Sequence, residues 1–244
     1  MKSILITGAS SGIGHTTAKL FLSKGWRVGV LARTAQPLLA LAEAHENAVA
    51  LPADVTDAAE LEAAFDKFVG SAGRLDVLFN NAGIFTPAAP IDEIPIEDWE
   101  RSVAVNLTGM FLAARLAFGQ MRRQDPAGGR IINNGSLSAH VPRPGSVCYT
   151  ATKHAITGLT RTLSLDGRDI GIACGQIDIG NANTPMVQGL NDRLLAEDPN
   201  ATLNPTMAVE DAASSVLHMA NLPPEANVQF MTVMATQMPY IGRG

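Results

Sequence analysis

The amino-acid sequence predicts an α/β fold built on a doubly wound parallel sheet of about seven strands with helices on both faces. Apolar runs of strand length alternate with longer runs of helical period along the whole chain. Parallel strands need right-handed crossovers of helix length, so this alternation favours one sheet with the first strand in its centre. A glycine-rich turn joins the first strand to the first helix, as in Rossmann-type sheets, where ligands bind at the carboxyl ends of the strands.

The expected elements follow one another without a break. Strands are predicted at residues 4–7, 28–32, 49–52, 75–79, 130–134, 171–177 and 228–233. Helices are predicted at residues 13–24, 37–45, 58–69, 96–123, 146–165 and 209–220. The long irregular stretches 80–95 and 180–205 both follow strands on the ligand side, and loops of that length are usually functional or mobile. No repeat or linker interrupts the pattern, so we expect a single domain over residues 1–244 with a substrate-side lid near 180–205.

Length and charge restrict the possible functions. A chain of 244 residues is long enough for one α/β domain with a large core. Its net charge of -5 and its lack of lysine or arginine clusters argue against binding to nucleic acid or to an anionic membrane surface. The sequence shows neither a signal-peptide pattern nor an apolar run of the roughly 18 residues that span a membrane. We therefore expect a cytoplasmic protein in which Cys148 and Cys174 are reduced.

The turn after the first strand predicts a phosphate site. Glycine tolerates the backbone angles of a tight turn and lets a ligand approach main-chain N–H groups. The first turn of the following helix presents unpaired donors and the positive end of the helix dipole. The alternative is a glycine-rich turn without a ligand. The residues expected at the site are Gly8, Ser10, Ser11, Gly12, Ile13 and Gly14.

The ends of the second and third strands predict the choice of cofactor. In a sheet of this kind the second strand meets the adenosine ribose, where an acidic residue accepts hydrogen bonds from the 2′-hydroxyl of NAD. Ala32 cannot accept them, and Arg33 is either a planar cation suited to the 2′-phosphate of NADP or a solvated surface residue. Asp54 and the adjoining Val55 are expected at the adenine, although Asp54 could equally cap the next helix, with Asp57 as the competing cap.

The fourth strand ends in a turn of small and amide-bearing residues. Such residues can hold strands together and approach a nucleotide closely. We therefore expect Asn81, Ala82 and Gly83 at the cofactor, although this segment taken by itself could be only a turn.

Tyr149 and Lys153 carry the predicted chemistry. At positions i and i+4 of one helix they share a face. An ammonium beside a phenol in a dry cleft favours the ionised form, so that the phenol can donate and accept a proton near neutrality. A Tyr-x-x-x-Lys pair also occurs by chance in many helices. Ser136, at the exit of the fifth strand, favours the catalytic interpretation because a hydroxyl there can bind a carbonyl oxygen.

With these residues in place, the chain resembles the short-chain dehydrogenase/reductase family over nearly its whole length. The resemblance implies that Tyr149 is the general acid/base and that Ser136 orients the substrate oxygen. It implies that Lys153 holds the nicotinamide ribose and favours the tyrosinate. The motifs that carry it, in order and at compatible spacings, are Thr7 to Gly14, Asp54, Asn80 to Gly83, Asn106, Ser136 and Tyr149 with Lys153.

The same resemblance assigns two further roles and exposes one departure. Asn106 matches an asparagine that steadies a water leading from the lysine to solvent, and Thr184 matches a threonine that contacts the nicotinamide amide. After the sixth strand the family usually has Pro-Gly, whereas this chain has Ile179 and Gly180. We expect both at the cofactor, but the path of the lid that follows them is open.

The remaining candidates leave alternatives. His140 and Arg143 could line a substrate mouth or could have ordinary loop roles. The histidines show no metal-ligand pairing, so we expect no catalytic metal. The apolar side chains between the sixth strand and the last helix could form a lid or simply pack down as an amphipathic segment. They are Met186, Leu190, Leu194 and Leu195.

We therefore expect an NADP(H)-dependent oxidoreductase that interconverts a carbonyl and an alcohol on a small-molecule substrate. The alternatives are an epimerase or dehydratase with tightly bound cofactor, and a non-catalytic NADP-binding sensor. A sensor should have lost Tyr149 or Lys153, and neither is lost.

The family also implies a homo-oligomer, a tetramer whose long fourth and fifth helices pair across subunits. Small or apolar residues suit such pairing, and burial within one subunit is the alternative. They are Gly109, Met110, Leu112, Ala113, Ala151, Ala155, Gly158 and Leu159.

Overall fold

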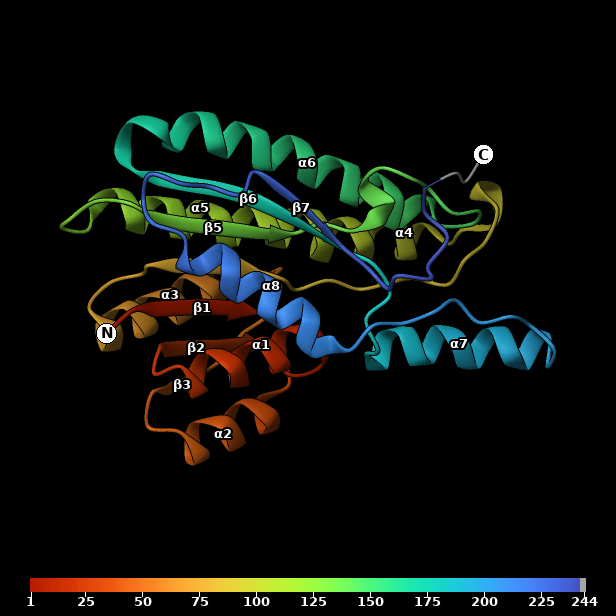
Figure 1. The fold of residues 1–244 in the computed structure, drawn as a ribbon, viewed down its shortest axis with the longest axis horizontal. Coiled ribbons are helices and arrows are strands. Elements are labelled where there is room, and N and C mark those ends of the chain that lie inside the picture. The colour runs from red at the N-terminus through yellow and green to blue at the C-terminus, as the bar shows by residue number, and fades with distance from the viewer. Residues whose placement is uncertain (242–244) are drawn as a thin grey trace.

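The computed structural model describes residues 1–241, apart from the side chain of Glu197, and contains one seven-stranded sheet between helices (Figure 1). The strands are β1 (Ser3–Thr7), β2 (Arg27–Ala32), β3 (Ala48–Pro52), β4 (Val77–Asn80), β5 (Gly129–Asn134), β6 (Ile172–Ile179) and β7 (Phe230–Val233). The α-helices are α1 (Gly12–Ser23), α2 (Ala35–Ala44), α3 (Ala58–Ala72), α4 (Ile96–Val103), α5 (Met110–Arg123), α6 (Val147–Gly167), α7 (Pro185–Glu197) and α8 (Val209–Asn221).

All strands of the sheet are parallel and lie in the order β3-β2-β1-β4-β5-β6-β7. The predicted doubly wound fold is confirmed. The expectation that β1 is central is wrong, because β4 takes that place and β1 lies beside it. The chain builds outward from β1 to β3, returns to β4 and then builds outward in the other direction. The crossovers therefore reverse between β1 and β4, which is where sheets of this kind bind ligands.

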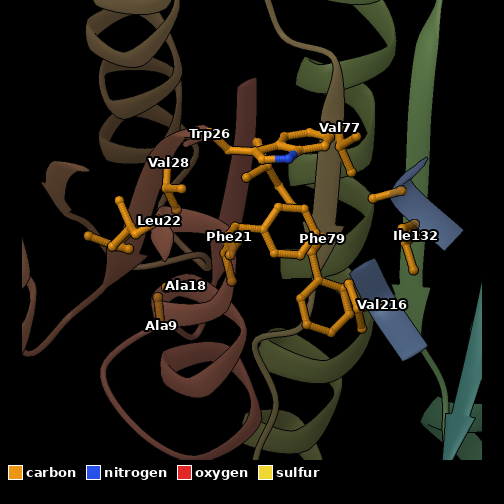
Figure 2. Close-up of a cluster of buried hydrophobic side chains, with 14 of the residues drawn as sticks. Ala9, Ala18, Phe21, Leu22, Trp26, Val28, Val77, Phe79, Ile132 and Val216 are labelled. Carbon is orange, nitrogen blue, oxygen red and sulfur yellow. The ribbon is translucent and has the colours of Figure 1, made fainter. Parts of the chain in front are cut away.

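One face of the sheet is covered by α1, α2 and α8. Ile6 of β1 and Phe79 of β4 pack there with Phe21 of α1 and Val216 of α8, all fully buried. The Phe21 ring meets the ring of Trp26 edge-on, with centroids 4.9 Å apart, and Figure 2 shows this pair in the cluster. Burial of each large apolar side chain contributes about 1.5–3 kcal/mol, so this cluster holds α1 and α8 against β1 and β4.

The other face is covered by α3, α5 and α6. Leu5, between two residues that face the first cluster, points to this side because side chains alternate along a strand. It packs with Phe68 of α3, Ala117 of α5 and Cys174 of β6. The two clusters together place helices α1 and α6 on opposite faces of one sheet (Figure 1).

The predicted helix over residues 96–123 is continuous but not uniform. A π-helical segment, η2 (Ala104–Gly109), lies between α4 and α5. By length and composition alone the stretch Ile96–Arg123 could cross a membrane, which we had not expected of any segment. In the structure 44% of its most apolar window is buried inside the protein, where α5 packs on β4 and β5.

The stretch expected to be irregular over 180–205 contains α7. Thr184 caps this helix by accepting a hydrogen bond from the N–H of Val187 (3.4 Å), and Pro185 occupies its first turn, where no N–H is needed. The two ends of the insertion are joined, because Ala182 and Met207 form a parallel bridge. Figure 1 shows α7 standing out from the body of the sheet beyond this junction.

Candidate functional site

A cavity of about 300 Å³ opens at the carboxyl ends of the strands, over the reversal between β1 and β4. Most residues predicted for the site line it. Two do not, namely Gly14 and Asn106. The predicted residues that do are Gly8, Ser10, Ser11, Gly12, Ile13, Arg33, Asp54, Val55, Asn81, Ala82, Gly83, Ser136, Tyr149, Lys153, Ile179, Gly180 and Thr184.

The glycine turn has the form that the phosphate prediction requires. Gly8 and Gly12 have φ angles of 68° and 53°, in the left-handed region that favours glycine. Ser11 makes no side-chain cap, so the first N–H groups of α1 have no side-chain partner. Gly14 lies behind the turn: a side chain there would collide with the carbonyl of Gly8. Gly14 therefore lets the helix approach the turn and does not line the cavity.

Hydrogen bonds between neighbouring strand ends hold the turn in place. The buried Thr7 Oγ1 accepts from the N–H groups of Asn81 (2.8 Å) and Ala82 (2.9 Å). The Asn81 side chain donates to the carbonyl of Thr7 (2.9 Å) and accepts from Asn134 Nδ2 (2.9 Å). The turn after β4 thus joins β1 to β5. Asn134 has no sequence signal beyond its position at a strand end, and the sequence did not identify it.

Arg33 and Asp54 lie together in the part of the cavity where the sequence predicts the adenosine. Their closest atoms, Nη1 and Oδ2, are 3.7 Å apart, and 68% of the Arg33 side chain is exposed. Asp54 Oδ1 accepts hydrogen bonds from Thr56, whereas Asp57 caps α3 by accepting from two N–H groups of its first turn. The alternative that Asp54 caps the helix is therefore wrong, and its outer carboxylate oxygen contacts only Arg33 among the described residues.

Tyr149, Lys153 and Ser136 converge on one part of the cavity. Tyr149 lies in the first turn of α6, and the ammonium of Lys153 is 5.4 Å from the centre of its ring. Lys153 is only 3% exposed and donates to the carbonyl of Asn134 (2.7 Å), which fixes its direction. Ser136 Oγ accepts from the N–H of Ser138 (3.1 Å), leaving its own hydrogen available to an acceptor in the cavity.

Asn106 holds the loop that borders this site. Its Oδ1 accepts from the N–H of Ile84 (2.8 Å) and its Nδ2 donates to the Ile84 carbonyl (2.9 Å). It lies in the π-helical segment, a geometry that is frequent at functional sites. The side chain is buried and committed to the backbone, so its water-holding role stays a prediction.

Asp178, a buried acid that the sequence did not identify, accepts a hydrogen bond from the backbone of Ser136. Asp178 of β6 is 1% exposed, and its Oδ1 accepts from the N–H of Ser136 (2.9 Å) and from Gln176 Nε2 (2.7 Å). Its Oδ2 pairs with His140 Nε2 at 2.8 Å. Gly135 leaves room for this carboxylate, because any side chain there would collide with it. His140 therefore pairs with Asp178 of β6 and does not line the cavity.

The remaining walls come from segments far apart in the sequence. Arg143 lines the cavity, as one of its two open interpretations required, and so do Met186 and Leu190 of α7. Leu194 and Leu195 do not. The segment after β7 also contributes, through Met238, Pro239 and Tyr240. The sequence did not identify this segment, because no pattern there indicates where the chain returns.

No group of three or more histidine, cysteine, aspartate or glutamate side chains is placed to hold a metal ion within residues 1–241.

Comparisons with known proteins show which family the chain resembles. The curated relatives include 2-(R)-hydroxypropyl-CoM dehydrogenase of Xanthobacter autotrophicus, 35% identical over 221 residues, which cover 85% of this chain and 88% of the relative. Secoisolariciresinol dehydrogenase of Forsythia intermedia is 34% identical over 231 residues, with 90% and 82% covered. The crystal structure of levodione reductase superposes with a TM-score of 0.88 at 26% identity, over 96% of each chain.

A family model described as short chain dehydrogenase matches residues 2–195, which include the glycine turn, Ser136, Tyr149 and Lys153. The match covers most of the chain, and the sheet order and relatives point the same way. This chain belongs to the short chain dehydrogenase family.

Proposed function

We propose that this protein is an NADP-dependent oxidoreductase that interconverts a carbonyl and an alcohol on a small molecule, with Tyr149 as general acid/base. The observation that carries the proposal is that Ser136, Tyr149 and Lys153 line the same cavity as the glycine turn. The dehydrogenase names of the relatives support the reaction class.

The residues of the adenosine and phosphate end fit a dinucleotide. Gly8 and Gly12 have no side chain to cover the main chain of the turn. The N–H groups at the start of α1 have no side-chain partner and suit a pyrophosphate. In the proposal, Asn81, Ala82 and Gly83 border the nicotinamide ribose, while Ile179, Gly180 and Thr184 lie at its ring. When bound, the reduced nicotinamide supplies the hydride.

The protein's own groups handle the oxygen and its proton. Ser136 donates a hydrogen bond to the substrate oxygen and holds it beside the Tyr149 hydroxyl, which gives up its proton during reduction and takes one back during oxidation. Lys153, held by the carbonyl of Asn134, places a positive charge near the tyrosine.

Arg33 favours NADP over NAD in this proposal. The residue before it, Ala32, offers no carboxylate to a ribose diol, and most of the guanidinium is exposed. The contact with Asp54 at 3.7 Å is long for a hydrogen bond, so an incoming phosphate competes with a weak partner.

The assembly and the lid complete the proposal. Residues 1–244 form one catalytic domain in a cytoplasmic homotetramer, and α7 closes over the substrate as a lid. Neither the epimerase or dehydratase nor the NADP-binding sensor gains a specific observation in its favour.

Replacement of Tyr149 by phenylalanine tests the catalytic role, because it removes only the hydroxyl. NADPH should still bind, while turnover of a panel of ketones and aldehydes, followed by nicotinamide absorbance, should fall by about 10²- to 10⁴-fold. Turnover that persists in Tyr149→Phe contradicts the assignment.

A further inference from the structure

The substrate end of the cavity, meaning the walls formed by Phe85, Val141, Arg143, Met186, Leu190 and Met238, carries a single charge. Four charged side chains line the cavity in the described part of the chain. Arg33 and Asp54 contact each other at the adenosine end, and Lys153 is bonded to the Asn134 carbonyl. Arg143 is the one charge left, among walls that are otherwise mostly apolar.

Contacts through the Phe85 ring connect Arg143 to Tyr149. Its guanidinium carbon lies 5.8 Å from the centre of the Phe85 ring, and that ring centre lies 5.0 Å from the ring centre of Tyr149. A cation over an aromatic face is attracted by the ring quadrupole, which fixes the guanidinium without using its N–H donors. The Phe85 ring therefore lies between the positive charge of Arg143 and the ring of Tyr149.

The backbone that carries Arg143 is also fixed. Ser146 donates to the carbonyl of Arg143 through its hydroxyl (2.7 Å) and its N–H (3.3 Å). The carbonyl of Gly145 accepts from the N–H of Ala89 (3.1 Å), which ties this turn to the loop that follows Phe85. Arg143 is half-buried, so its position is not that of a freely solvated side chain.

The guanidinium has donors to spare. Within residues 1–241 no hydrogen bond or ion pair engages its five N–H groups. A planar fork of this kind matches a carboxylate, phosphate or sulfonate through paired hydrogen bonds. We propose that Arg143 binds an anionic oxygen group of the substrate, so that the enzyme acts on oxo and hydroxy acids whose carbonyl and anionic groups are joined by a short apolar chain.

This inference rests on the proposed function for the place of the carbonyl, but binding can test it without turnover. The oxidised complex with NADP⁺ cannot reduce an oxo acid, so affinities can be measured by calorimetry in that complex. The probes are acetoacetate, levulinate and their next two homologues, each compared with its methyl ester, which keeps the carbonyl and removes the charge.

Wild-type protein should bind the best acid about 10- to 150-fold more tightly than its ester, as expected for hydrogen bonds to a charged group. Arg143→Ala should lose that preference while binding the ester within about twofold of the wild type. Arg143→Lys should keep only part of it, because lysine lacks the planar fork. Arg122→Ala is the matched control: Arg122 also stacks on a phenylalanine, Phe118 at 5.1 Å, but lies outside the cavity.

Equal binding of acid and ester, no saturable binding of any acid, or unchanged acid affinity in Arg143→Ala overturns the inference. The turnover assay separates it from the proposed function. An acid that binds through Arg143 but is never reduced by NADPH contradicts the oxidoreductase. Reduction of neutral ketones by NADPH, together with equal binding of acid and ester, contradicts only the anion site.

Discussion

We propose that one side chain, Arg33, decides between NADP and NAD. Arg33→Ala should weaken NADP binding by about 10- to 150-fold, in the lower half of that range because no second cation stands in the glycine turn. NAD binding should stay nearly unchanged, and adding Ala32→Asp should reverse the preference. Fluorescence titration with both reduced cofactors measures this.

The control for this titration is Arg168→Ala, an exposed arginine at the opposite end of the sheet before β6. If the wild-type protein binds NAD as tightly as NADP, or if Arg33→Ala weakens both alike, Arg33 does not bind the phosphate. Asp54 should sharpen the effect, since without Arg33 its carboxylate would repel the phosphate.

Because Cys174 is buried, we expect the free energy of unfolding to fall as the pH rises above 9.0. Burial raises the pKa of its thiol from 9.0 to about 12. The unfolded chain loses this proton above pH 9.0 while the folded chain keeps it, so the stabilisation is complete below pH 9.0 and is lost as the pH rises toward 12. Each pH unit in that window should cost up to about 1.4 kcal/mol.

Urea unfolding at several alkaline pH values measures this slope. Cys174→Ala should be less stable than wild type at neutral pH but should lose stability less steeply above pH 9.0. Other titrating groups are common to both proteins, so equal slopes would show that the thiol is not responsible.

At this scale the sequence predicted residues whose chemistry is unusual for their position. A tyrosine and lysine on one helix face, a serine at a strand exit and an arginine beside an alanine each stand out from the local pattern. Asp178, Asn134 and Tyr240 were not identified, because their importance arises from contacts between segments distant in the chain. An acid within an apolar strand was the one available signal for Asp178.

Among the elements, the π-helical segment η2 is tied through Asn106 to the backbone of Ile84. Asn106→Ala leaves the N–H and carbonyl of Ile84 without their side-chain partners, which should lower the free energy of unfolding by about 1–3 kcal/mol. Thr108→Ala, at an exposed position of the same segment, should change it by less than about 0.5 kcal/mol. Equal losses in chemical denaturation would mean that η2 itself, and not this pair of bonds, is sensitive.

Helices that pack on the sheet were predictable and α7 was not. The helices on the two faces carry apolar stripes that the sheet buries, and their period is visible in the sequence. No described side chain of α7 is buried, so its apolar side chains gain no packing against the sheet, and Thr184 caps its start. The break of α-helical geometry at η2 was likewise invisible, because nothing in the composition marks it.

For the whole molecule, the structure refines the predicted tetramer. Gly109, Met110 and Ala113 are buried within one chain, whereas Gly158 is exposed and the other four residues proposed for pairing are partly buried. Large apolar side chains remain exposed on α4, α5 and α6, namely Ile96, Trp99, Phe111 and Leu165.

Light scattering should give the mass of four chains at micromolar concentration, and Phe111→Glu should reduce it. Leu39→Glu is a matched control, because Leu39 on α2 is exposed to the same 49% on the other face. A monomer mass for the wild type contradicts the tetramer. Equal masses for the two variants would place the contact elsewhere.

The sheet as a whole was predictable because alternation of apolar periods determines parallel crossovers, whereas its order was only partly so. Each crossover can add the next strand at either edge of the growing sheet, and this determines how many strands lie on each side of β1. In this sheet β5, β6 and β7 lie beyond β4. The packing of whole layers determines the edge at which each strand is added, and no local sequence pattern predicts it.

The bridge between Ala182 and Met207 has a consequence for how members of such a family diversify. Backbone hydrogen bonds from Met207 to Asn181 and from Asn183 to Met207, each 2.9 Å, bring both ends of the inserted segment to one point. A segment whose ends are joined in this way can be lengthened, shortened or exchanged as a cassette without altering the sheet or the glycine turn. We expect that grafting this cassette between homologues would transfer substrate range while leaving cofactor choice with the recipient.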